Sequence, residues 1–93
     1  MAKLMPMRIE YKNEFTKQFN KASAKIQLAF QNRLEIFIAN PFDIILNNHA
    51  LSGRFAGRRS INITGDWRAI FRESGNYHLV IFETLGTHSQ LYK

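Results

Sequence analysis

The hydrophobic positions at the start of the chain change from a loose alternation to a helical spacing. Residues Met5 to Tyr11 alternate loosely and predict a short first strand. After Asn13, which is a suitable helix N-cap, apolar residues recur at the i, i+4 and i+7 spacing of one helix face. These residues are Phe15, Phe19 and Ala22. The pattern therefore predicts a strand followed by an amphipathic helix.

A second and longer helical pattern covers residues 24–39. Its apolar stripe consists of Ile26, Phe30, Leu34, Phe37 and Ile38. Pro41 ends this helix, because proline disfavours helical geometry in the residue before it. Residues 40–43 (Asn-Pro-Phe-Asp) then resemble a new helix start, with a cap, a proline at N1 and an acid at N3, and predict a short third helix ending near Asn47. We expect the helices to form an antiparallel hairpin followed by this short third helix.

After Leu51 the spacing changes to the alternation of β-strands. Residues 59–63, 67–72 and 77–85 each predict a strand, and glycine-containing turns separate them. The third of these strands is the most continuously apolar, so we expect it inside the sheet. The last residues are expected to add an edge strand or to cross the sheet.

The order of these elements predicts an α+β fold. It consists of an N-terminal strand, a two-helix hairpin with a short third helix, and a three- to four-stranded antiparallel sheet with the helices on one face. A chain of 93 residues is long enough for one such domain, which would span residues 1–93.

Charge and composition narrow the function. The net charge is +6, and five arginines but only one acid, Asp66, lie between Arg54 and Arg72. This balance favours a polyanionic partner, either a nucleic acid or an acidic protein surface. The absence of cysteine excludes disulfides and thiolate sites. No segment reaches the roughly 18 apolar residues of a membrane span, and the N-terminus lacks a signal-peptide core, so we expect a cytoplasmic protein without membrane contact.

Polar residues near the predicted strand ends suit the cleavage of a phosphodiester. His49, Asp66 and His88 would each be an ordinary loop residue if taken alone, but a meander returns the chain to the same sheet ends and can bring them together. Cleaving RNA without a metal needs a base, an acid, and cations at the charged phosphorane. Histidine and arginine are suited to these tasks by pKa and by the shape of the guanidinium.

Aromatic residues in the same part of the chain are suited to stacking on bases. These residues are Trp67, Tyr77 and Tyr92. A position in the core is the alternative for Trp67.

A metal site is the competing use of His49, His78 and His88. No pair of them has the i, i+4 spacing of a helical metal motif, and no carboxylate lies in a recognisable ligand motif. We therefore expect no metal and no cofactor. His78, near the start of a hairpin, is expected to be solvated.

Three segments of the chain resemble the RelE/ParE superfamily of bacterial toxins, and most of all its YafQ-type mRNA interferases. They are residues 49–53 (His-Ala-Leu-Ser-Gly), the pair Asp66-Trp67, and residues 86–92 (Gly-Thr-His-Ser-Gln-Leu-Tyr). The resemblance extends over nearly the whole chain in element order and implies the RelE-like microbial RNase fold. It implies a toxin that cuts mRNA in the ribosomal A site, leaving a 2′,3′-cyclic phosphate and a 5′-hydroxyl. It also implies a cognate antitoxin, through which alone the toxin would meet operator DNA.

The resemblance assigns roles to individual residues. His88 matches the general acid, and either Asp66 or His49 would be the base. Arg68 matches the arginine that RelE and YoeB use at the transition-state phosphate. The residues expected to bind or position RNA are Arg58, Arg59, Trp67 and Tyr92.

Two positions depart from the YafQ pattern. A further histidine of that pattern would fall at Asn62, and an arginine would fall at Thr84. The asparagine at position 62 can donate a hydrogen bond but cannot act as a base. The positive charge that is missing at Thr84 would come from Arg58, Arg59 or Arg68. These departures make a catalytically weak toxin retained for antitoxin binding one alternative. A ParE-like gyrase inhibitor of the same fold is another, but it needs no acid–base pair and leaves the histidines unexplained.

Overall fold

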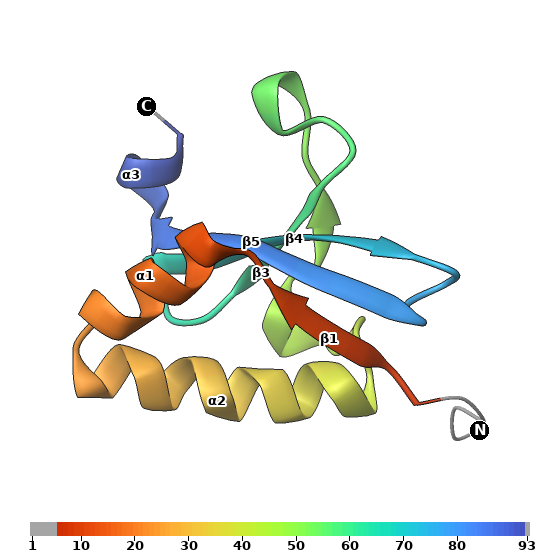
Figure 1. Ribbon diagram of the computed structural model, residues 1–93, viewed down its shortest axis with the longest axis horizontal. Coiled ribbons are helices and arrows are strands. Elements are labelled where there is room, and N and C mark those ends of the chain that lie inside the picture. Colours follow the sequence, from red (N-terminus) through yellow and green to blue (C-terminus); the bar gives the residue numbers. More distant parts are fainter. Residues whose placement is uncertain (1–5, 93) are drawn as a thin grey trace.

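The computed structural model describes residues 6–92 and shows a helical hairpin packed against a five-stranded mixed sheet (Figure 1). In chain order the elements are β1 (Arg8–Tyr11), α1 (Asn13–Lys21), α2 (Ala24–Ala39), η1 (Ile44–Leu46), β2 (His49–Ala50), η2 (Gly53–Phe55), β3 (Arg59–Asn62), β4 (Trp67–Ser74), β5 (Leu79–Thr87) and α3 (His88–Leu91). Met5, the predicted start of the first strand, lies outside the described residues. No helix within residues 6–92 is long and apolar enough to cross a bilayer.

The sheet confirms the α+β class but has more strands than predicted. Its order is β1-β5-β4-β3-β2, so β5 is interior, as its apolar sequence predicts. β1 pairs in parallel with β5, with Arg8 opposite Leu79, whereas the other pairs are antiparallel. Parallel neighbours need a long crossover connection, and the segment between β1 and β5 in the sequence, which includes α1 and α2, supplies it. β2 was missed because two residues, His49 and Ala50, are too few to show an alternation.

The second helix matches its prediction most closely. α2 spans Ala24–Ala39, and the Ser23 hydroxyl accepts a hydrogen bond from the Ile26 amide at its start. Ile38, which was expected to face the core, is 45% exposed. Adjacent residues of a helix differ by about 100° around its axis, so Phe37 and Ile38 cannot both point inward. Phe37, which is fully buried, takes the inward position.

The helix starts predicted at Asn13 and Asn40 are wrong. Lys12 occupies the N-cap of α1, without a side-chain hydrogen bond, and Asn13 is already helical. The expected third helix is only the 3-10 turn η1, which begins after Asp43 because the Asp43 carboxylate accepts a hydrogen bond from the Ile45 amide. Asn47, with a left-handed backbone conformation (φ 46°), ends this turn close to the predicted position.

The chain end and the last hairpin also differ from their predictions. Residues 88–91 form α3 and not an edge strand, because Thr87 and Gln90 form a capping box. The Thr87 hydroxyl accepts from the Gln90 amide, and the Gln90 side chain accepts from the Thr87 amide. Tyr77 lies in the β4–β5 turn with a φ of 69°, so β5 begins at Leu79.

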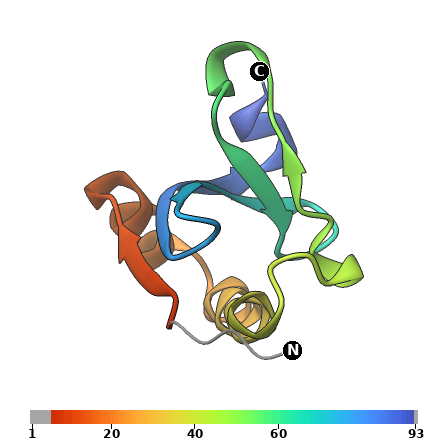
Figure 2. The same cartoon turned by 90° about the vertical axis from the view of Figure 1, so that its right-hand side faces the viewer.

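The core lies between the helices and one face of the sheet. Phe82 of β5 is fully buried, and its ring centroid lies 5.3–5.7 Å from four other phenylalanine rings. These rings belong to Phe15, Phe30, Phe37 and Phe71. Figure 2 shows α2 below the sheet, with the η2 loop (residues 51–58) and α3 rising from the opposite side. Packing on one face therefore leaves the other face available for a site.

Candidate functional site

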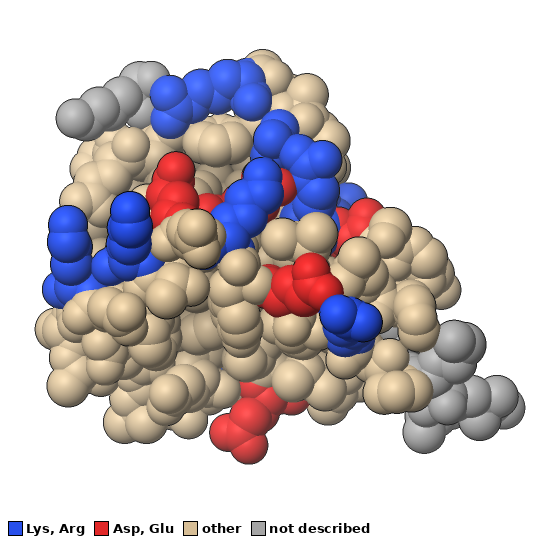
Figure 3. Space-filling model, in the orientation of Figure 1, with Lys and Arg blue, Asp and Glu red and all other residues tan. Residues whose placement is uncertain are grey.

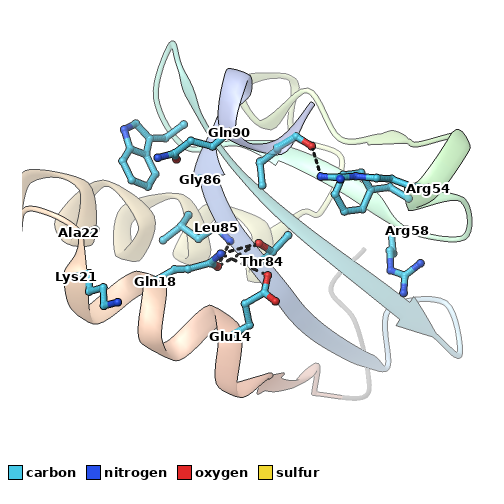
Figure 4. Close-up of a pocket in the computed structure, with 13 residues that line it drawn as sticks. Glu14, Gln18, Lys21, Ala22, Arg54, Arg58, Thr84, Leu85, Gly86 and Gln90 are labelled. Carbon is cyan, nitrogen blue, oxygen red and sulfur yellow. Dashed lines mark hydrogen bonds between the residues drawn. The ribbon is translucent and has the colours of Figure 1, made fainter. Parts of the chain in front are cut away.

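A cleft of about 680 Å³ lies between α1, the η2 loop, the end of β5 and α3. In Figure 4, Glu14 and Gln18 reach from α1, and Arg54 and Arg58 lie across the cleft from them. The rest of the lining consists of Lys21, Ala22, Phe55, Trp67, Thr84, Leu85, Gly86, Gln90 and Leu91. Figure 3 shows lysine and arginine side chains gathered over α1 and the strands, whereas the visible surface of α2 is mostly uncharged. The cleft therefore opens on the basic part of this face.

Two of the predicted catalytic residues come together beside this cleft. The Asp66 carbonyl accepts a hydrogen bond from the His88 amide at 2.9 Å, which joins the β3–β4 turn to the first residue of α3. Both residues are exposed. The His88 ring lies 4.8 Å from the Tyr92 ring, and Tyr92 lies 6.0 Å from Phe55 of the η2 loop. Asp66, His88 and Tyr92 thus form one cluster, which reaches the cleft through Phe55.

Trp67 lies partly in the core and partly at the cleft. It is partly buried against the core cluster and also lines the cleft. Its place in the register, opposite Thr87, sets it between Asp66 and the start of α3. A ligand in the cleft would meet the exposed part of the indole ring.

Arg68 is folded back onto its own turn. Its Nη1 atom donates to the carbonyls of Thr64, Gly65 and Trp67 at 3.1–3.2 Å. These contacts hold the guanidinium against the β3–β4 turn. Within residues 6–92 its Nε and Nη2 atoms make no hydrogen bond, so two nitrogens with three N–H donors remain available for an anion.

His49 is not brought to this cluster. It lies exposed on the edge strand β2, opposite Ser60, and its Nδ1 is 2.8 Å from the Asn47 carbonyl. The carbonyl can only accept, so this contact places a proton on Nδ1. Within the described part of the chain, no hydrogen bond or ring contact joins His49 to Asp66 or His88.

Arg59 and Tyr77 are also directed away from the cleft. The Nε atom of Arg59 donates to Asn48 at 2.8 Å, and its guanidinium lies 5.5 Å from the Phe42 ring centroid. Tyr77 is 5% exposed and belongs to the core, where its hydroxyl accepts a hydrogen bond from Asn48. The expected stacking role of Tyr77 is therefore wrong, because its ring is not accessible.

Sequence reasoning missed Glu83, which organises the cations of this face. Ile70 lies opposite Thr84 and Phe71 lies opposite Phe82, so Glu83 is the extra residue of a β-bulge. Its side chain is 9% exposed and forms three ion pairs. The partners are the Nε of Arg58 at 2.6 Å, the Nε of Arg72 at 2.7 Å and the Nζ of Lys12 at 3.3 Å.

These contacts lower the pKa of Glu83. Burial by itself raises the pKa, but the hydrogen bond and charge of Arg58, followed by the charge of Arg72 and the contact with Lys12, outweigh it. The sequence did carry one signal, because an acid within the most apolar strand must find cations if it is buried. Which cations would reach it depends on the tertiary fold.

The two positions that depart from the YafQ pattern have different surroundings. Thr84 is buried and exchanges hydrogen bonds with Gln18, which also accepts from the Leu85 amide at 2.6 Å. Asn62 has a buried Oδ1 atom without a hydrogen-bond partner among the described residues. The guanidinium of Arg58 lines the same cleft as Thr84, so positive charge is present there.

The described residues contain no group of three or more His, Asp or Glu side chains that could hold a metal ion. His78 is exposed in the β4–β5 turn.

Comparison with known proteins identifies similar chains. A family model for YafQ, a bacterial toxin of type II toxin–antitoxin systems, matches residues 7–93. The crystal structure of YafQ from E. coli is similar at 25% identity, over 94% of this chain and 99% of that chain, with a TM-score of 0.73. The E. coli DinJ–YafQ toxin–antitoxin complex gives 24% identity, 96% and 100% coverage, and a TM-score of 0.77.

The RelBE2 toxin–antitoxin complex from Mycobacterium tuberculosis shares the fold at 16% identity, with 96% and 99% coverage and a TM-score of 0.74. No curated protein sequence gave a significant match.

Proposed function

This chain belongs to the YafQ family of bacterial toxins of type II toxin–antitoxin systems, and from this premise we propose that it is an endoribonuclease that cuts mRNA in the ribosomal A site. The observation that supports this most is that the His88 amide donates to the Asp66 carbonyl, which brings these two residues together next to Trp67, a residue of the cleft lining. An acid–base pair next to cations and an aromatic platform matches what metal-independent RNA cleavage requires.

His88 is the proposed general acid that protonates the 5′-oxygen leaving group. Its ring is exposed and packs at an angle of 48° against Tyr92, which limits its orientation. An imidazole can donate a proton from a ring nitrogen, which suits the role of general acid. Tyr92 would serve both as support for this ring and as a surface for a base.

Asp66 is a better candidate than His49 for the base that takes the 2′-hydroxyl proton. Asp66 is joined to His88 through the backbone, whereas His49 lies on β2 and is held by the Asn47 carbonyl. An acid and a base acting on one phosphodiester must both reach it. Proximity therefore favours Asp66.

Arg68 is the proposed cation at the transition-state phosphate. Three carbonyls hold its Nη1 atom, so little reorganisation is needed when charge develops on the phosphorane. Arg58 would add positive charge on the cleft side. We assign Arg59 to holding β2, since it contacts Asn48 and Phe42.

A cognate antitoxin is the proposed protein partner, with operator DNA reached only through it. The family is defined by type II toxin–antitoxin systems, and the similar E. coli chain is found in a complex with DinJ. Acidic residues of such an antitoxin would cover the arginines of the cleft and compete with RNA for them. High salt should then weaken RNA binding more than antitoxin binding, because the antitoxin also buries apolar surface; equal salt slopes would contradict this.

A catalytically weak toxin, kept for antitoxin binding, is the second candidate function. The observation that favours it is the presence of Asn62 and Thr84 where the YafQ pattern has a histidine and an arginine. Such a protein would bind its antitoxin without arresting growth.

The test is to induce the wild-type chain, His88→Ala and His78→Ala in bacteria and to map 5′-hydroxyl ends on mRNA. His78 is the matched control, because it is an exposed histidine in the β4–β5 turn. We expect codon-phased ends with the wild type and His78→Ala but none with His88→Ala. Growth arrest without new ends would instead indicate a gyrase inhibitor, and expression without arrest would indicate the catalytically weak toxin.

A further inference from the structure

Three cations from different parts of the chain converge on one buried carboxylate. Lys12 lies between β1 and α1, Arg58 precedes β3, and Arg72 belongs to β4, yet all three contact Glu83 at 2.6–3.3 Å. The β-bulge at Glu83 makes this possible, since bulges redirect side chains and are frequent beside active sites. Three cations around one acid leave two positive charges in excess.

Both arginines keep donors free for another anion. Each uses its Nε atom for Glu83, and Arg58 also donates weakly through Nη1 to the Ala56 carbonyl at 3.3 Å. Among residues 6–92, the Nη2 atom of Arg58 and both terminal nitrogens of Arg72 make no hydrogen bond. The Arg72 side chain is 47% exposed, so its terminal nitrogens are accessible to a ligand.

A structural role alone explains only part of this arrangement. A single arginine would suffice to neutralise Glu83, and a buried ion pair is weak evidence for stability because of its desolvation cost. The excess charge becomes useful if an anion binds beside it. Arg58 lines the cleft that also contains Trp67, so the charge is continuous with the proposed active site.

We propose that Glu83 is a positioning residue that holds Arg58 and Arg72 at a fixed spacing, so that their remaining donors bind two phosphates of one RNA strand, Arg58 at the cleft and Arg72 on the surface outside its lining. The inference rests on the proposed function, because it assigns RNA as the ligand. Guanidinium groups bind phosphate through paired N–H donors, and an arginine fixed by a carboxylate loses less freedom on binding. Glu83 itself does not touch the RNA in this arrangement.

Removing the Glu83 charge separates this proposal from simple electrostatics. If the cleft attracts RNA only through its net charge, Glu83→Gln makes it more positive and RNA binds more tightly. If Glu83 positions the arginines, the same change releases them and RNA binds more weakly. Glu14→Gln is the matched control, because Glu14 lines the same cleft but forms no ion pair with an arginine.

The measurement is the affinity of the full-length chain for a short single-stranded RNA methylated at its 2′-hydroxyls, determined by fluorescence anisotropy over a series of salt concentrations. Each lost phosphate contact should reduce the slope of log K against log salt by about 0.7 for single strands. For Glu83→Gln we expect roughly three- to tenfold weaker binding at low salt and a slope reduced by about 1.4. Glu14→Gln should bind as tightly as the wild type, or more tightly, with an unchanged slope.

A second variant keeps the proposal falsifiable if Glu83→Gln does not fold. Arg72→Gln leaves the Arg58–Glu83 pair intact and changes a half-exposed side chain, so the variant should fold. Its slope of log K against log salt should be smaller than that of the wild type by about 0.7, the value for one phosphate contact. An unchanged slope in Arg72→Gln would overturn the proposal. So would tighter binding by Glu83→Gln, or a wild-type chain that does not bind this RNA at low salt.

The design also separates this inference from the proposed function. The methylated RNA cannot be cut, so its binding does not depend on catalysis, and His88→Ala should bind it normally while producing no mRNA ends. Normal mRNA cleavage by Glu83→Gln with unchanged RNA affinity would overturn only the positioning role. If Glu83→Gln lost affinity for a polyglutamate peptide but not for RNA, the arginines would serve an acidic protein partner and the RNA proposal would be wrong.

Discussion

Gln18 joins α1 to β5 where both line the cleft, and its replacement tests how much this connection stabilises the fold. β1 pairs with β5 only as far as Phe82, so the following backbone of β5 lacks a strand neighbour on that side. Gln18 replaces this neighbour: its Oε1 accepts from the Leu85 amide at 2.6 Å, and its Nε2 lies 3.0 Å from the Thr84 hydroxyl (Figure 4). Gln18→Ala removes both contacts at once.

The expected loss of stability follows from these two groups. Leu85 is 2% exposed, so its amide becomes a buried donor without an acceptor, at a cost of about 1–3 kcal/mol. The Thr84 hydroxyl faces the cleft and can turn toward water, so its loss costs about 1 kcal/mol. We therefore expect Gln18→Ala to lower the free energy of unfolding by about 2–4 kcal/mol, which for a domain of this size lowers the Tm by roughly 10–20 °C.

The assay is urea denaturation followed by circular dichroism, with Gln31→Ala as the control. Gln31 is an exposed glutamine of α2, so its replacement should change the free energy of unfolding by less than about 0.5 kcal/mol. Gln18→Glu retains the acceptor for Leu85 and should lose less than Gln18→Ala. If Gln18→Ala were as stable as Gln31→Ala, water would satisfy the Leu85 amide and the reasoning about this edge would be refuted.

Three further predictions concern the Glu83 carboxylate, the junction between β5 and α3, and the core. In the folded protein, burial raises the pKa of Glu83, but its cationic neighbours lower it by more, so the pKa lies below the ordinary value of 4.5. The ionised carboxylate therefore stabilises the fold above pH 4.5, and this contribution is lost as the pH falls through the folded pKa. Urea titrations from neutral to acid pH should therefore show a steeper loss of stability in the wild type than in Glu83→Gln, and parallel curves would contradict this linkage. Gly86→Ala would place a methyl group 3.1 Å from Gln90 Oε1 and 3.3 Å from Leu91 Cδ2, so we expect α3 to shift and mRNA cleavage to fall before the Tm does; cleavage at the wild-type level would show that α3 adjusts without displacing His88. Phe37→Ala should cost about 3–5 kcal/mol in urea denaturation, because the ring is fully buried, and a loss below about 1 kcal/mol would mean that the core collapses into the space.

Local patterns predicted the elements whose causes are local. α2 was predicted at its observed bounds because a helical stripe and a proline stop lie within one continuous segment. α3 and β2 were missed, since the first depends on a four-residue capping box and the second on two residues paired with β3. Elements this short carry too few positions for a period to be visible.

The candidate site divides in the same way. Asp66, Trp67 and His88 were singled out from the sequence, and the register of β4 with β5 places them beside each other. His49 and Arg59 were singled out equally, but the fold places Arg59 on Asn48 and leaves His49 on an edge strand. Residue type indicated which side chains suit the chemistry, while strand pairing decided which of them meet.

The sequence by itself determined the α+β class, the bounds of the long helix, the interior position of the apolar strand and the basic character of one surface. These follow from hydrophobic periodicity, turn residues and charge, which act between residues close in the chain. Only the tertiary structure decided that Glu83 gathers Lys12, Arg58 and Arg72, because these residues lie 11–71 positions away from it in the sequence. A β-bulge turns the carboxylate toward them, and these cations keep it ionised although it is buried, two effects that no local pattern specifies.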